Sequence, residues 1–125
     1  MTCVLALVPD LLFGSRVQGA LAAAGQEVEL IGDEQRLRER LRDPEAPAGE
    51  VLIVDLTDER LDGAAILESL SGDGLLARVR TLAFYSHVDA AVRTRASEAG
   101  FDLVVPRSRM AREAPELLAG LAARG

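Results

Sequence analysis

Five short apolar runs alternate with five stretches of helical spacing, and this alternation limits the possible folds more than any other feature. The runs are nearly continuous, as in strands that are covered on both faces, and each is followed by apolar residues at helical intervals. Such an order predicts one parallel sheet with helices on both faces and right-handed crossovers, an α/β fold. The predicted strands lie at residues 2–8, 27–31, 50–55, 81–86 and 103–105.

Three aspartates precede helical patterns and are expected to act as N-caps: Asp10, Asp33 and Asp62. The run at 27–31 alternates at its start, which favours an edge strand. The predicted helices cover roughly residues 11–24, a short charged stretch after residue 33, residues 63–70, a stretch that starts near residues 87–89 and ends at 99, and residues 110–123.

Length and composition exclude several classes of protein. A chain of 125 residues with 49% hydrophobic and 27% charged residues predicts one globular domain over residues 1–125. A net charge of −6 and only 3% aromatic residues disfavour nucleic-acid binding. No run is long enough for a membrane span, and no basic leader opens the chain, so we expect a bacterial-type cytoplasmic protein. A single cysteine, Cys3, excludes an internal disulfide and a cysteine-based zinc site.

Polar side chains follow four of the predicted strands: Asp10, Asp55, Ser86 and Arg107. In a parallel sheet the carboxyl ends of the strands share one edge, and ligand sites lie beyond that edge. These four residues are therefore the candidate site.

The order and spacing of these residues resemble a response-regulator receiver domain of the CheY-like superfamily. Asp55 lies between Val54 and Leu56 where receivers carry the phosphoacceptor, and Ser86 and Arg107 fall on the switch positions. Residues 98–102, Glu-Ala-Gly-Phe-Asp, look like the segment before the last strand of that family. The resemblance implies a flavodoxin-like (βα)5 sandwich of three layers with strand order 2-1-3-4-5.

The chain also departs from the receiver pattern. The acidic pair that holds Mg²⁺ in receivers falls on Val8 and Pro9, and Arg107 replaces the family's lysine. Magnesium requires near-octahedral oxygen coordination, which Asp10 and Asp55 alone supply only in part. We therefore expect a pseudo-receiver without a metal or other cofactor, and Mg²⁺ enters only if Asp55 is a working phosphoacceptor.

Three arginines cluster after the last predicted strand: Arg107, Arg109 and Arg112. With Arg93 and Arg95 they predict a face for an anion or an acidic partner, because guanidinium groups bind oxyanions in a bidentate manner. The alternative is pairing of the cluster with Asp55, Asp58 and Glu59 across the top of the sheet.

Other candidate residues have simpler interpretations. Ser86 could bond to a loop backbone instead of reporting a phosphoryl group. His87 is the only histidine and is expected in a loop or capping role. Of Leu11, Leu12 and Phe13, two are expected in the core.

The resulting functional hypothesis is a stand-alone, receiver-like signalling module that acts through protein contacts and is not an enzyme. By resemblance, a partner or a second copy docks on the fourth helix, fifth strand and fifth helix, and a salt bridge from Asp55 to Arg107 holds the loops in one state. No nucleophile–base pair or cofactor motif indicates catalysis. Two alternatives remain: a phosphoacceptor of a two-component phosphorelay using Asp55, and a regulatory domain that binds a small anion or nucleotide.

Overall fold

The computed structural model describes residues 3–86 and 90–123, and strands and helices alternate throughout this part of the chain. Observed bounds differ from the expected ones by at most three residues. The strands are β1 (Cys3–Leu7), β2 (Glu27–Ile31), β3 (Val51–Asp55), β4 (Arg80–Tyr85) and β5 (Leu103–Pro106). The helices are α1 (Leu11–Ala23), α2 (Glu34–Arg42), α3 (Gly63–Gly72), α4 (Ala90–Ala99) and α5 (Arg107–Ala123).

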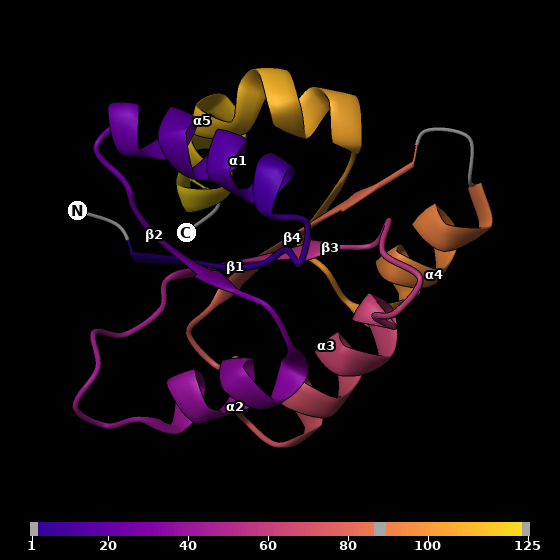
Figure 1. Ribbon diagram of the computed structural model, residues 1–125. Helices are drawn as coiled ribbons and strands as arrows, with labels where there is room; N and C mark the ends of the chain where they lie inside the picture. Colours follow the sequence, from indigo (N-terminus) through magenta and orange to yellow (C-terminus); the bar gives the residue numbers. More distant parts are fainter. Residues whose placement is uncertain (1–2, 87–89, 124–125) are drawn as a thin grey trace.

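The strands form one parallel sheet in the order β2-β1-β3-β4-β5, as predicted. Ala6 in the central part of β1 is in register with Leu30 on one side and Ile53 on the other. The expected edge position of residues 27–31 is confirmed, and β5 forms the opposite edge. Figure 1 shows α1 and α5 on one face of the sheet and α2, α3 and α4 on the other.

The sheet separates two hydrophobic cores. Val4, Ile53 and Phe84 point to the α1–α5 side, where they pack with Leu21 and Leu118. The other face of the same strands packs against α2, α3 and α4 through a second set of residues: Leu5, Leu7, Leu52, Val54, Leu37, Leu70 and Ala96. Every strand of the central part is therefore covered on both faces, which explains the continuous apolar runs.

The three predicted N-caps are confirmed. Asp10 Oδ1 accepts from the amides of Leu12 and Phe13 at 3.0 and 3.2 Å. Asp33 accepts from the Arg36 amide at 2.9 Å, and Asp62 caps α3 in the same way. These bonds satisfy amides that have no partner inside the helix, so the caps fix where the helices begin.

The last helix differs from the expectation. It begins at Arg107 rather than at residue 110, so Arg107 and Arg109 lie on helix instead of in the preceding loop. Glu113 has non-helical angles (φ −128°, ψ 23°), and Pro115 follows it inside the helix. Proline cannot donate to the carbonyl four residues earlier and clashes with it, which accounts for the kink.

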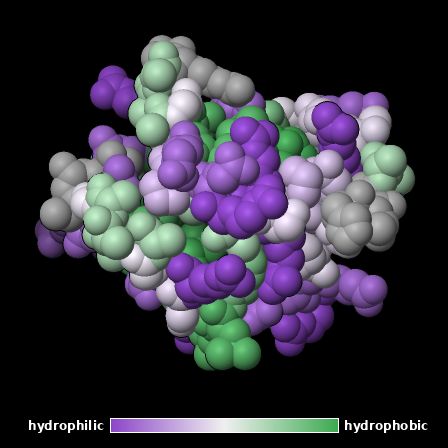
Figure 2. Space-filling view, turned by 90° about the horizontal axis from the view of Figure 1, so that it is seen from above, coloured by the Kyte–Doolittle hydropathy of each residue, from purple (hydrophilic) through white to green (hydrophobic). Residues whose placement is uncertain are grey.

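The expectation for the start of α1 was wrong. Phe13 is buried, but Leu11 and Leu12 are 72% and 88% exposed. The periodicity of α1 places Phe13, Val17 and Leu21 on the core face, and no such position is left for the first two residues. Figure 2 shows the α1–α5 face, where hydrophilic side chains are interspersed with hydrophobic areas.

No helix in residues 3–86 and 90–123 combines the length and apolar character that a membrane span requires.

Candidate functional site

An open pocket of about 810 Å³ lies at the carboxyl ends of the strands, between the starts of α1 and α5. Three of the four predicted strand-end residues line it: Asp10, Ser86 and Arg107. Asp55 lies at the same edge, at the end of β3, but is only 2% exposed and is not part of the lining. The structure therefore brings Asp10, Ser86 and Arg107 together around one pocket and places Asp55 beside it.

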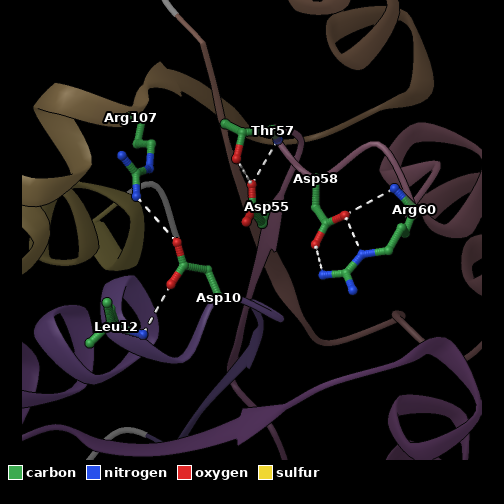
Figure 3. Close-up of polar contacts among 7 residues, drawn as sticks. All are labelled: Asp10, Leu12, Asp55, Thr57, Asp58, Arg60 and Arg107. Atoms are coloured by element: carbon green, nitrogen blue, oxygen red, sulfur yellow. Dashed lines mark hydrogen bonds and ion pairs between the residues drawn. The ribbon is translucent and has the colours of Figure 1, made fainter.

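Asp55 is held by Thr57, a residue that we did not single out from the sequence. The Thr57 amide and hydroxyl both donate to Asp55 Oδ1, at 2.7 and 2.6 Å. Figure 3 shows Thr57 above the carboxylate, and Thr57 itself lines the pocket. The two bonds offset part of the cost of burying a carboxylate. Asp side chains commonly accept from the backbone amide two residues on, so the amide bond could have been expected from the sequence.

Asp10 contacts two elements. Its Oδ1 caps α1, as described above, and its Oδ2 lies 3.6 Å from Arg107 Nη2 at the start of α5. Both side chains are about half exposed. The Asp10 carboxylate therefore connects the loop before α1 with the first turn of α5 (Figure 3).

The expected salt bridge between Asp55 and Arg107 is wrong. Arg107 pairs with Asp10, and its guanidinium carbon lies 4.1 Å from the centroid of the Phe13 ring. Phe13 in turn packs on Phe84 with ring centroids 5.0 Å apart. Because Arg107 starts a helix that packs beside α1, its side chain lies over α1, while Asp55 is already bonded beneath Thr57.

The expected pairing of the arginine cluster with Asp55, Asp58 and Glu59 is also wrong. Arg109 and Arg112 instead contact Glu113 at 3.5 and 3.7 Å, within α5. Glu113 lies one helical turn after Arg109 and directly follows Arg112, so it is the local partner of both.

Asp58 and Arg95 have close partners of their own. Asp58 bonds to Arg60, and this hydrogen bond lowers the pKa of the Asp58 carboxyl. Arg95 on α4 bonds to Glu68 on α3 at 2.6 Å, which lowers the pKa of Glu68. Arg93 is exposed on the same helix and does not line the pocket. The structure therefore does not join α4 and α5 arginines into one cluster.

The donor set does not fit a receiver-type Mg²⁺ site. Val8 is 2% exposed within the α1–α5 core, and Pro9 offers no side-chain oxygen. One carboxylate oxygen of Asp10 caps α1, and the other faces Arg107. One carboxylate oxygen of Asp55 accepts two hydrogen bonds from Thr57. In the part of the chain that the structure describes, no three His, Cys, Asp or Glu side chains could hold a metal ion together.

Ser86 is exposed at the end of β4 and lines the pocket. The predicted role of His87 falls outside the described residues, as does the expected helix start at 87–89. Arg16 and Phe13 also line the pocket; Arg16 was not singled out from the sequence, and Phe13 was considered only with Leu11 and Leu12, as core or as the lip of the site. Arg16 lies one turn after Phe13 on α1, and a search for residues near the predicted cap at helical spacing would have found both.

No protein-family model matches the chain, and no curated protein matches it in sequence. Solved structures do match. The receiver domain of the response regulator TorR of the TMAO respiratory system has a TM-score of 0.84 at 17% identity, over 99% of this chain and 98% of that one. The phosphorylated cyanobacterial phytochrome response regulator RcpA has a TM-score of 0.82 at 14% identity, over 99% and 96%. A putative pilus assembly-related protein of Burkholderia pseudomallei has a TM-score of 0.78 at 20% identity, over 98% and 90%.

At these low sequence identities the comparisons establish the fold, and the chemistry of the site has to be inferred from the residues of this chain. The strand order, the five parallel strands and the coverage of nearly the whole of each chain agree. The protein thus has the flavodoxin-like fold of CheY-like response-regulator receiver domains.

Proposed function

We propose that this chain is a receiver-fold signalling module that acts through protein contacts and does not undergo Mg²⁺-dependent phosphorylation. The observation that carries the proposal is the donor set at the end of β1: a buried Val8, Pro9, and an Asp10 whose carboxylate is engaged by α1 and Arg107. Without a metal, no divalent ion lies between Asp55 and a transferring phosphoryl group to offset the negative charge that develops in that step. In this proposal residues 1–125 act as one domain in the cytoplasm, where Cys3 stays a thiol.

In the ligand-free protein, contacts of Arg107 join two of the segments at the carboxyl edge of the sheet. Arg107 is held by Asp10 on one side and by the Phe13 ring on the other. A receiver that responds to phosphorylation needs a bistable element that the phosphoryl group biases. Here an internal ion pair and a cation–π contact already join the β1–α1 loop to the start of α5.

The proposed docking face consists of α4, β5 and α5. Most α4 side chains are exposed, and Ala96 is its one fully buried residue among those described. Next to α4, β5 is an edge strand. Arg93 and Arg109 add positive charge to this surface, which favours a protein partner with an acidic patch. A second copy of the chain is the alternative occupant, and analytical ultracentrifugation distinguishes the two.

The first test is intact-mass spectrometry after incubation with acetyl phosphate and Mg²⁺. We expect no phosphoryl adduct on the wild-type protein or on Asp55→Asn, while an active receiver domain treated in parallel gains one. An adduct on the wild type that is absent from Asp55→Asn would overturn the proposal, because Asp55 would then be a working phosphoacceptor despite Val8 and Pro9. Circular dichroism confirms that both proteins are folded.

The second test measures the loop contact itself by hydrogen exchange. Arg107→Ala removes both contacts of the guanidinium, so amides at the starts of α1 and α5 are expected to exchange faster. Arg78→Ala is the matched control, because Arg78 is exposed before β4, at the opposite edge of the sheet. Identical exchange in both variants would show that Arg107 does not hold the loops.

A further inference from the structure

Three guanidinium groups surround the pocket at the carboxyl edge, and none of them is firmly paired. Arg16 and Arg112 line it together with Arg107. Arg107 lies 3.6 Å from Asp10, and Arg112 lies 3.7 Å from Glu113 with its side chain 70% exposed. Arg16 is exposed and has no ion pair with any of residues 3–86 and 90–123. These separations are longer than the 2.7–2.9 Å of a charge-assisted hydrogen bond.

Several arginines elsewhere are paired differently. Arg38 bonds to Asp73 at 2.7 Å, Arg40 to Glu29 at 2.9 Å, and Arg95 to Glu68 at 2.6 Å. The guanidinium groups of these three arginines donate to carboxylates of the same chain at close range. Within the part of the chain that the structure describes, the pocket arginines keep most of their five N–H donors available for a ligand.

The rest of the lining suits an anion. Ser86 and Ser108 place hydroxyl groups on the pocket wall, and both residues are exposed. Among the described residues of the lining, Asp10 is the one carboxylate, and one of its oxygens already accepts from two α1 amides. Asp55 is buried beneath the pocket, and Thr57 donates to its carboxylate. The pocket therefore carries a net positive charge in a chain whose overall charge is −6.

We propose that this pocket binds a phosphate dianion without covalent attachment and without a metal. The dianion is either free phosphate or the terminal group of a small phosphomonoester. Arg107 turns from Asp10 to the ligand, and Arg16 and Arg112 approach it from α1 and α5. Volume supports a small ligand, since about 810 Å³ lies within the range of small-molecule pockets. The proposal does not depend on the docking face proposed above.

The test is a ¹⁵N NMR titration of the full chain in EDTA at constant ionic strength, with inorganic phosphate, adenosine 5′-monophosphate and adenosine as probes. We expect saturable shifts for amides at the starts of α1 and α5 with both phosphate probes and none with adenosine. Tighter binding of the monophosphate would identify an ester as the ligand, and equal or weaker binding would identify free phosphate. Affinity falls as salt rises, because the site is open to solvent.

Variants make the test specific. Arg107→Ala is expected to weaken binding about tenfold or more, and Arg16→Ala several-fold, while Arg78→Ala leaves the affinity unchanged. Asp10→Asn is expected to tighten binding several-fold, because asparagine keeps the helix cap but no longer competes for Arg107. This gain cannot arise from a folding defect.

Three results would overturn the proposal. Linear, unsaturated shifts would show only non-specific ion association. An equal loss in Arg107→Ala and Arg78→Ala would show that overall charge, not this pocket, governs binding. Adenosine binding as tightly as its monophosphate would show that no phosphate is recognised. The titration contains EDTA and no phosphodonor, so it cannot report covalent phosphorylation of Asp55. The proposal of phosphate binding and the proposal of a module without phosphorylation can therefore each be refuted independently.

Discussion

Replacing Asp10 separates two roles that one carboxylate performs. Its Oδ1 caps α1 through two amides, and its Oδ2 faces Arg107 at 3.6 Å. Loss of an N-cap costs about 1 kcal/mol of unfolding free energy. A half-exposed ion pair at this distance contributes at most about 0.5 kcal/mol. Asp10→Ala is therefore expected to cost roughly 1.5 kcal/mol, whereas Asp10→Asn, which keeps the cap, costs no more than about 0.5 kcal/mol.

Urea unfolding followed by circular dichroism measures both values, provided that the slope of free energy against urea is the same in each variant. A double-mutant cycle with Arg107→Ala isolates the ion pair, whose coupling is expected to stay below about 0.5 kcal/mol. If Asp10→Asn is as costly as Asp10→Ala, charge rather than capping dominates, and the division of roles derived from the structure is refuted.

The remaining predictions concern packing, exposure and pH. Gly63→Ala is expected to lower the free energy of unfolding by about 1–3 kcal/mol, because the new Cβ would lie 2.9 Å from the buried Val54 Cγ1; unfolding with no loss would contradict this. Leu12→Gln is expected to change it by less than about 0.5 kcal/mol, since Leu12 is 88% exposed, and a larger loss would reveal hidden packing. Arg95→Gln is expected to lower the melting temperature at pH 7 and to lose this effect in acid: bonding to Arg95 lowers the pKa of Glu68, so the stabilisation exists above the unfolded pKa and disappears as pH falls through the folded one. An effect of Arg95→Gln that persists at pH 2 would argue against this linkage.

The architecture could be predicted because its signals are local and repeated. A run such as residues 51–54 is apolar at every position, which only a strand covered on both faces requires. Asp10, Asp33 and Asp62 marked the helix starts because capping is a contact over two or three residues. These features do not depend on how distant elements meet.

The site could be predicted only in part because ion-pair partners depend on distances between loops. The sequence places Asp55 and Arg107 at one edge, but the packing of α5 beside α1 decides that Arg107 meets Asp10 and Phe13. Leu12 was misjudged for a different reason, since the helical period that places Phe13 and Val17 on the core face leaves Leu12 outside it. The bond from the Thr57 amide to Asp55, in contrast, spans only two residues and could have been predicted from the sequence.

The two separate cores have a consequence for how the protein tolerates change. Phe13, which supports Arg107, belongs to the core under α1 and α5, whereas Leu70 belongs to the core on the other side of the sheet. Substitutions at residues that share no neighbours usually have additive effects on stability. A substitution at Leu70 is thus expected to lower the free energy of unfolding by an amount that adds to the effect of a change at Phe13, and a stabilising change elsewhere in the molecule could offset it. The free energy of unfolding and the recognition of a ligand can then vary independently. Stabilising substitutions in the α2–α3–α4 layer would allow the protein to tolerate destabilising substitutions around the pocket.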